Sequence, residues 1–168
     1  MNDISNLVDF LLNVYKLKEI KRKGWVVKVG IKDAESVASH TFGMVLLASI
    51  IYNEPLLIKN IALHDIAEAK IGDLLPEEKD KRSEDNAYEE IIKNIAEKWN
   101  LPKNLNDIFK YEKVKELDRL DMALQALYYK EKGYPKEKLM EFIEAAEKEI
   151  KSKELKEILN EIKRRFEK

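Results

Sequence analysis

The chain has 168 residues, of which 45% are hydrophobic and 38% are charged, and its 31 basic and 32 acidic residues give a formal net charge of −1. A chain of this length can bury about two-thirds of the surface that it exposes when unfolded, which is enough for the core of one domain. The small net charge argues against a surface that wraps a nucleic acid polymer, and it fits a small anionic ligand better. The composition therefore predicts a soluble globular protein.

Three absent features indicate where the protein is located: an apolar membrane span, a signal peptide and cysteine. No apolar run approaches the roughly 20 residues that a membrane-spanning helix needs. Residues 1–12 contain Asp3 and Asp9 and lack the basic leader of a signal peptide. The absence of cysteine excludes disulfides and thiolate metal ligands, so a metal ion would take nitrogen and oxygen ligands. We expect a cytoplasmic protein with no membrane partner.

The spacing of apolar residues predicts an all-α fold of about six helices, because they recur at intervals of three and four between only five glycines and four prolines. Residues 26–33, interrupted by Gly30, are the one stretch where a short extended segment is expected. Pro55 suits the first turn of a helix, Ser83 is a candidate N-cap, and the last helix is expected to break near Ser152. No linker divides the chain, so we expect one domain. The predicted helices cover, approximately, residues 4–21, 35–52, 55–70, 83–99, 107–132 and 136–168.

The only two histidines, His40 and His64, fall on the apolar faces of two predicted helices, and Asp65 follows His64 directly. Asp118 lies at the edge of the apolar stripe of a third predicted helix. Burying an imidazole or a carboxylate is costly unless a partner compensates it, and a metal ion compensates several such groups together. Each signal alone is weak, because a single histidine on an apolar face is more often hydrogen-bonded in the core. The combination of the four favours a metal site.

The order of these residues, H then HD then D, resembles the signature of the HD-domain metal-dependent phosphohydrolases, which are helical proteins. Residues 35–40 (E-S-V-A-S-H) are similar to the family's segment around the first histidine. Residues 62–68 (A-L-H-D-I-A-E) and the following Gly72-Asp73 are similar to the segment around its HD pair, and residues 115–118 (K-E-L-D) to the segment of the last ligand. The likeness is to the 5′-deoxynucleotidase branch and covers most of residues 10–130, on which the helices of residues 136–168 are expected to pack.

The resemblance implies that His40, His64, Asp65 and Asp118 hold one divalent transition metal ion. Cobalt or manganese is favoured, and iron, nickel and zinc are alternatives with the same kind of ligands. It also implies that Glu68, which follows Asp65 by three residues, manages a proton during hydrolysis.

Three further residues are assigned to substrate binding by the same resemblance: Arg22, Trp25 and Asp73. Each has a structural alternative. Asp73 follows a glycine and could cap a turn, Arg22 stands near a helix C-terminus, and Trp25 could anchor the core below the loop.

We therefore expect a phosphomonoesterase that hydrolyses deoxyribonucleoside 5′-monophosphates to the deoxynucleoside and phosphate. One alternative is an HD phosphohydrolase that acts on a triphosphate or another phosphorylated metabolite. Another is a non-catalytic helical module whose metal ion only holds three helices together, although such a module has no need of Glu68. A homodimer is also expected, with Tyr128, Tyr129 and Tyr134 as a candidate interface.

Overall fold

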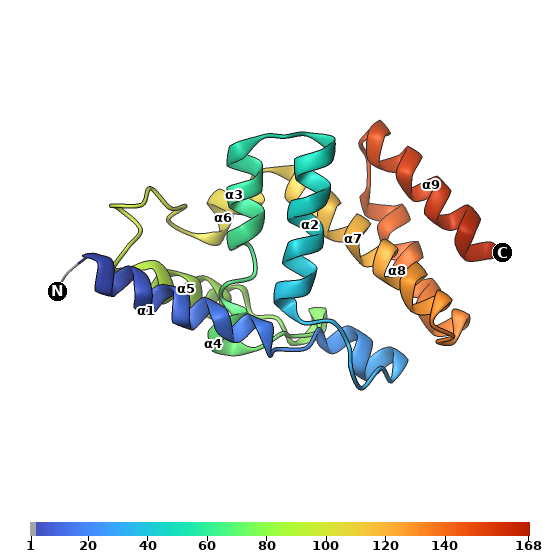
Figure 1. Cartoon of the computed structure of the whole chain (residues 1–168), viewed down its shortest axis with the longest axis horizontal. Helices are drawn as coiled ribbons and strands as arrows, with labels where there is room; N and C mark the ends of the chain where they lie inside the picture. Colours follow the sequence, from blue (N-terminus) through green and yellow to red (C-terminus); the bar gives the residue numbers. More distant parts are fainter. Residues whose placement is uncertain (1–2) are drawn as a thin grey trace.

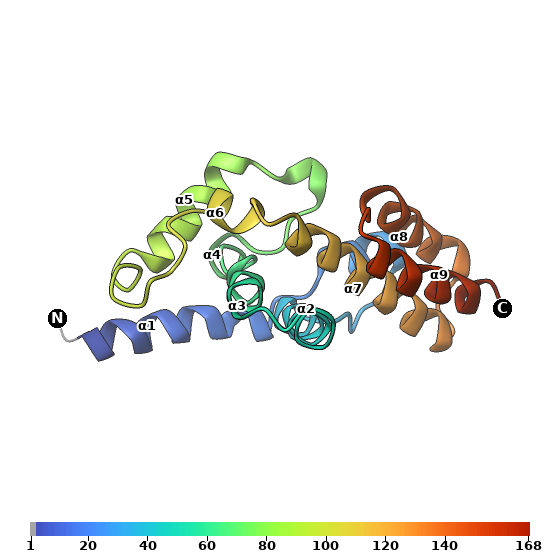
Figure 2. The ribbon, with the colours of Figure 1, turned by 90° about the horizontal axis from the view of Figure 1, so that it is seen from above.

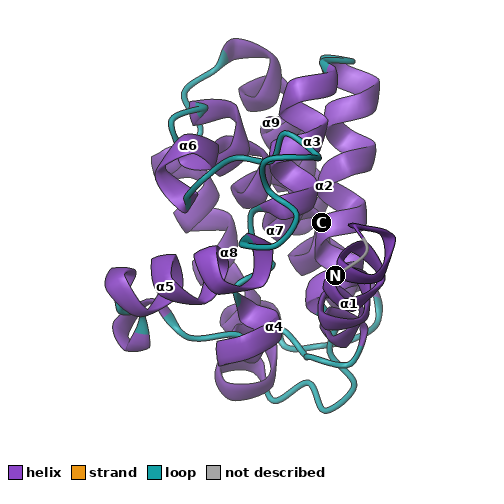
Figure 3. Ribbon diagram, turned by 90° about the vertical axis from the view of Figure 1, so that its left-hand side faces the viewer, coloured by secondary structure: helices purple, strands orange, loops and turns teal. Residues whose placement is uncertain are grey.

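A computed structural model describes residues 3–168, and the all-α prediction is confirmed, since these residues form helices and loops (Figure 3). The only bridge of β type within them pairs Lys21 with Ser36. Helical turns are formed by Lys16–Lys18, Trp25–Val29 and Pro76–Glu78. The α-helices of the described range are α1 (Asp3–Tyr15), α2 (Val37–Ile51), α3 (Pro55–Leu63), α4 (Glu68–Ile71), α5 (Lys81–Ile92), α6 (Leu105–Phe109), α7 (Glu112–Glu131), α8 (Lys136–Glu149) and α9 (Lys153–Glu167).

The long helix α7 is the element that the others surround. It packs against α2, α3, α6, α8 and α9. Figures 1 and 2 show α2 and α3 as an antiparallel pair beside α7, with α1 and α9 reaching opposite ends of the molecule. Val114, Leu117 and Leu120 of α7 are completely buried, as apolar residues at intervals of three on a central helix should be.

The helix starts follow from side chains that cap the first free backbone N–H groups. Ser36 accepts a hydrogen bond from the Ser39 backbone at 3.1 Å and begins α2. Asp80 caps α5, so the prediction that Ser83 is the cap is wrong. The Asp80 carboxylate accepts bonds from both the backbone N–H and the hydroxyl of Ser83, which places Ser83 inside the first turn.

The expectation of an extended segment over residues 26–33 is also wrong, because Trp25–Val29 form one turn of π-helix. The carbonyl of Trp25 accepts hydrogen bonds from the backbones of both Gly30 and Ile31, each at 3.1 Å. Gly30 has a φ of 88°, a left-handed conformation that favours glycine, and it ends the turn. Trp25 and Val29 are buried, so tertiary packing stabilises this turn.

The structure has more helices than the predicted six because several predicted helices are divided. The one expected over residues 55–70 becomes α3 and α4, and the one over 107–132 becomes α6 and α7. The first helix ends at Tyr15 before a turn of 3-10 helix, and α5 gives way to a series of turns after Ile92. The expected break near Ser152 is confirmed, since it separates α8 from α9.

Within the described residues no helix combines the length and the apolar character that crossing a bilayer requires.

The start of α9 is attached to α7 by one buried carboxylate. Glu116 accepts hydrogen bonds from the backbones of Lys151 and Ser152, at 2.7 and 3.1 Å. Both N–H groups belong to the short link between α8 and α9, which has no helical hydrogen bonds to offer them.

We predict that Glu116→Ala lowers the free energy of unfolding by about 1–3 kcal/mol, because it leaves two backbone donors unsatisfied at a buried corner. Chemical denaturation measures the loss, and hydrogen exchange should show it first in α9. Exchange in α9 that does not change would show that the corner is held by other contacts.

Candidate metal centre

His40 enters the core from the buried face of α2. It is 1% exposed and lies on the same face as Val37 and Met44, which are completely buried. The three-and-four spacing of these residues sets this direction, as the sequence predicted.

His64 and Asp65 lie where α3 gives way to a tighter turn. Hydrogen bonds join His64 to Ile61, Ile66 to Leu63, and Glu68 to Asp65, so that each spans three residues instead of the four of an α-helix. Neighbouring side chains on a regular α-helix point about 100° apart. Here both reach the same place, and His64 Nε2 lies 3.0 Å from Asp65 Oδ2.

Asp118 of α7 completes this cluster of four predicted ligands. Its Oδ1 lies 3.1 Å from His40 Nε2, and Asp65 Oδ2 lies 3.9 Å from the same nitrogen. His40, His64 and Asp65 each offer a ligand atom, and these atoms lie within 4.8 Å of one another. The structure thus brings together four groups from α2, the turn after α3, and α7.

The hydrogen bonds of the two imidazoles leave the same nitrogen free on each ring. His40 Nδ1 lies 2.8 Å from Asp121 Oδ2, and His64 Nδ1 lies 2.6 Å from the Ile61 carbonyl. Both partners accept hydrogen bonds, so Nδ1 is the donor on each ring, and Nε2 is the nitrogen that would give its lone pair to a metal ion. Both Nε2 atoms are buried without a hydrogen-bond partner. Two converging, unpaired imidazole nitrogens beside two carboxylates fit a divalent metal ion.

Arg22 balances the negative charge of this centre. Its guanidinium lies 3.5 Å from Asp65 and 3.7 Å from both Asp73 and Asp118. Burial lowers the pKa of Arg22, but these carboxylates outweigh it and raise the pKa above its usual value. Burial likewise raises the pKa of Asp65, and the neighbouring His64 ring and the Arg22 guanidinium outweigh it and hold this pKa well below the ordinary range. Both carboxylates that face the imidazoles are therefore ionised, since Asp118 shifts in the same direction.

His40 is held in a strongly electronegative environment. Burial and Arg22 lower its pKa, while Asp118 and Asp121 raise it to about 10. A metal cation at Nε2 would take the place of this proton, since metal ligands bind in their deprotonated form.

Glu68 lies at the start of α4 with its side chain turned inward. It is 4% exposed, and neither of its carboxylate oxygens has a hydrogen-bond partner. Lys79 Nζ lies 4.0 Å from Glu68 Oε1. Burial, followed by the charges of Asp65 and Asp73, raises the pKa of Glu68. This shift in pKa favours the protonated form of the carboxyl group.

The side chain of Trp25 packs in the core. It is 2% exposed, its ring centroid lies 4.0 Å from that of Phe142, and its Nε1 donates to Glu35 at 2.8 Å. This position fits the structural alternative for Trp25, a side chain that anchors the core below the loop. Asp73 accepts a hydrogen bond from the Lys23 backbone and also lies 3.7 Å from the Arg22 guanidinium, and its contact with a substrate stays a prediction.

Sequence reasoning assigned no role to three residues that line this centre: Asp121, Glu35 and Lys79. Asp121 could have been found, because it follows Asp118 by one helical turn and faces the same way. Glu35 belongs to the segment that resembles the family. Lys79 lies in a loop, and no periodic pattern connects it with Glu68.

We predict that Trp25→Ala lowers the free energy of unfolding by about 3–5 kcal/mol, the cost of emptying a buried aromatic site. The chain has only one other tryptophan, Trp99, which is 40% exposed, and Trp99→Ala is the matched control with a smaller loss. Urea denaturation followed by circular dichroism measures both. Equal losses would contradict the core position of Trp25.

Relatives of this chain are found by sequence over nearly its whole length. The HD-domain family model matches residues 14–162. The 5′-deoxynucleotidase HDDC2 of Homo sapiens is 28% identical, over 94% of this chain and 84% of that protein. The 5′-deoxynucleotidase YGK1 of Saccharomyces cerevisiae is 30% identical, over 88% of this chain and 77% of that protein.

Solved structures with the same arrangement of helices include two archaeal proteins. A conserved hypothetical protein from Pyrococcus furiosus matches with a TM-score of 0.71 and 28% identity, over 94% of this chain and 99% of that one. The PH0347 protein from Pyrococcus horikoshii matches with a TM-score of 0.70 and 29% identity, over the same shares of the two chains. Family model, relatives and structures agree, and the chain belongs to the HD-domain family.

Proposed function

We propose that the protein is a metal-dependent phosphomonoesterase that hydrolyses deoxyribonucleoside 5′-monophosphates. The observation that carries the proposal is the pairing of two unpartnered imidazole nitrogens with a buried carboxyl group, Glu68, that has no hydrogen-bond partner either. A metal site that only held helices together would have no use for such an acid. The relatives named 5′-deoxynucleotidase support the choice of substrate class.

His40, His64, Asp65 and Asp118 would hold the ion, and with one ion at this set two of six octahedral positions would stay open. When bound, the ion would supply a Lewis acid for the phosphoryl group and a nucleophilic water at neutral pH. The nitrogen and oxygen ligands suit cobalt or manganese, which the proposal favours, as well as iron, nickel and zinc.

Arg22 is the residue best placed to bind the phosphate. Its guanidinium is oriented by Asp65, Asp73 and Asp118, and a planar guanidinium can donate two parallel hydrogen bonds to a phosphate. The contacts with Asp73 also keep this side chain from turning away. We propose that Asp73 acts on the substrate both in this way and by contact with the sugar.

Glu68 would act as the general acid at the other end of the scissile bond. Because burial keeps it protonated, it can give its proton to the 5′-oxygen of the departing deoxyribose. Lys79, at 4.0 Å, is near enough to stabilise the carboxylate that remains.

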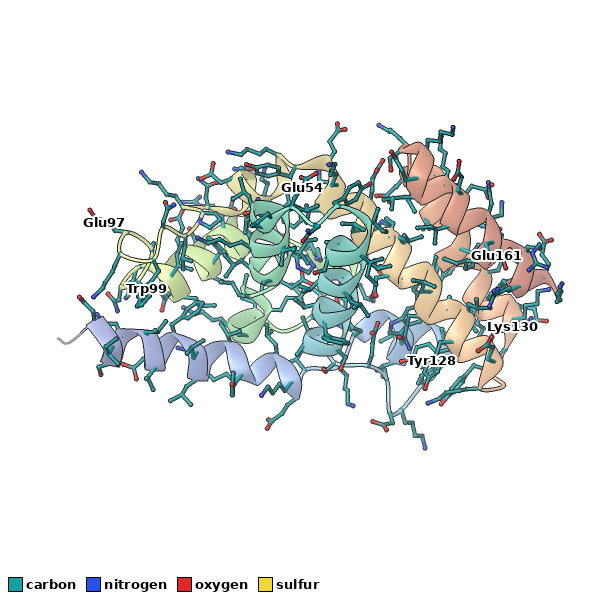
Figure 4. All side chains as sticks on the ribbon, turned by 45° about the horizontal axis from the view of Figure 1, so that its top comes forward. Glu54, Glu97, Trp99, Tyr128, Lys130 and Glu161 are labelled. Carbon is teal, nitrogen blue, oxygen red and sulfur yellow. The ribbon has the colours of Figure 1, made fainter. Side chains whose placement is uncertain are left out.

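A homodimer and a cytoplasmic location stay predictions. Of the three tyrosines proposed for an interface, Tyr129 is buried and Tyr134 is half-buried, whereas Tyr128 is 50% exposed and projects from α7 at the surface (Figure 4). An interface at this place would therefore use Tyr128, while Tyr129 supports Trp25 from inside.

We predict phosphate release from deoxyribonucleoside 5′-monophosphates in the presence of Co²⁺ or Mn²⁺. The same screen should include ribonucleoside monophosphates and the deoxyribonucleoside di- and triphosphates, each with several divalent cations. Pyrophosphate or triphosphate release from the triphosphates alone would favour a different HD hydrolase. If no nucleotide released phosphate, the alternative of a non-catalytic helical module would be favoured.

We predict that Glu68→Gln lowers kcat by about 10²–10⁴-fold, the usual contribution of a general acid, and leaves the metal content unchanged. Glu90→Gln is the matched control, because Glu90 is an exposed carboxylate paired with Lys70. Metal analysis and phosphate release on the same samples separate the two effects. A variant that loses its metal ion but keeps its rate would contradict the assignment.

A further inference from the structure

Asp121 is a buried carboxylate of α7 for which the proposed hydrolysis has no chemical step. It is 8% exposed, and its Oδ2 lies 2.8 Å from His40 Nδ1, on the side of the ring opposite to the cluster around Nε2. A carboxylate in this position can only accept a hydrogen bond from Nδ1–H. It thereby decides which nitrogen of His40 has the lone pair.

Gly43 provides the space that this carboxylate occupies. A Cβ atom built on Gly43 would lie 2.1 Å from Asp121 Oδ1, which is far inside van der Waals contact. Gly43 belongs to the interior of α2 and is not among the glycines with positive φ, so its backbone conformation does not require glycine. Glycine in such a position destabilises a helix by about 0.5–1 kcal/mol relative to alanine. The absence of a side chain at Gly43 leaves space for the Asp121 carboxylate.

We infer that Asp121 and Gly43 form a positioning pair that fixes His40 in the Nδ1–H form and aims Nε2 at the metal ion. This inference rests on the proposed metal centre and adds two residues to it. Neither touches the ion or the substrate. Asp121 acts through His40, and Gly43 acts through Asp121.

A second group of possible ligands lies on the other side of His40, so the ring could bind a metal ion through either Nε2 or Nδ1. Glu35, His40 and Asp121 also place ligand atoms within 4.8 Å of one another, so an ion on this side would use His40 Nδ1. A neutral imidazole has only one lone pair to give. The hydrogen bond to Asp121 assigns it to Nε2 and to the cluster with His64, so the chain binds one ion and not two.

The first test measures the affinity for Zn²⁺ by competition with a chromophoric chelator. We expect Asp121→Asn to weaken binding about 10–100-fold, the usual cost of losing such a hydrogen-bond partner of a ligand. An asparagine amide can also donate to Nδ1, which would put the proton on Nε2 and oppose the metal ion. Gly43→Ala should weaken binding in the same way, although it changes neither member of the hydrogen bond.

The matched control is Glu116→Gln. Glu116 lies on the same helix, is also 8% exposed, and accepts hydrogen bonds, but from the backbone before α9. It should lower stability and leave Zn²⁺ affinity unchanged. If Asp121→Asn weakened binding no more than Glu116→Gln does, the inference would be overturned. Failure of the wild-type chain to bind Zn²⁺ would instead overturn the proposed function.

The second test uses the fact that the chain has only two histidines, so the imidazole ¹⁵N spectrum of the Zn²⁺-loaded protein contains two rings. In the wild-type protein both rings should show a proton at Nδ1 and a metal-bound Nε2. Asp121→Asn should shift the His40 Nδ1 signal or speed its proton exchange, while His64, bonded to the Ile61 carbonyl, stays unchanged and reports that the variant is folded. Binding of a second Zn²⁺ with loss of the His40 Nδ1 proton would overturn the inference.

Discussion

The structure depends on how two imidazoles are compensated inside an apolar core. On each ring Nδ1 donates to a fixed acceptor, whereas Nε2 is buried without a hydrogen-bond partner. The two Nε2 atoms lie in the same cluster. A buried polar atom without a partner costs about 1–3 kcal/mol. Two of them side by side, close to ionised Asp65 and Asp118, form a site that a bound cation would compensate. The proposed metal ion would therefore contribute to the stability of the fold as well as to the chemistry.

Helix α7 connects this centre to the rest of the molecule. It supplies Asp118 and Asp121 on the side that faces α2, and Glu116 on the side that begins α9. The same helix packs along α8, which supplies the Phe142 ring that covers Trp25. Changes in the C-terminal helices can thus reach the centre through α7, even though those helices contribute no predicted ligand.

Much of the centre could be predicted from the sequence, because its residues lie on regular helical faces. His40 shares its face with Val37 and Met44, and the inward direction follows from spacing alone. The joint approach of His64 and Asp65 could not be predicted in this way, since it needs the tightened turn after α3. For Trp25 the resemblance indicated the substrate and the core remained an alternative; nothing in the local sequence shows that α8, more than 100 residues later, covers it. The π-helical turn that positions it has the same long-range origin.

X-ray absorption at the zinc edge of the Zn²⁺-loaded protein tests the central claim most directly, because it counts the imidazoles around the ion. The account predicts one ion per chain with two nitrogen ligands from imidazole, at about 2.0–2.1 Å, and oxygen ligands for the remainder. A spectrum with one imidazole or none would show that the two rings do not share an ion, and would contradict the account.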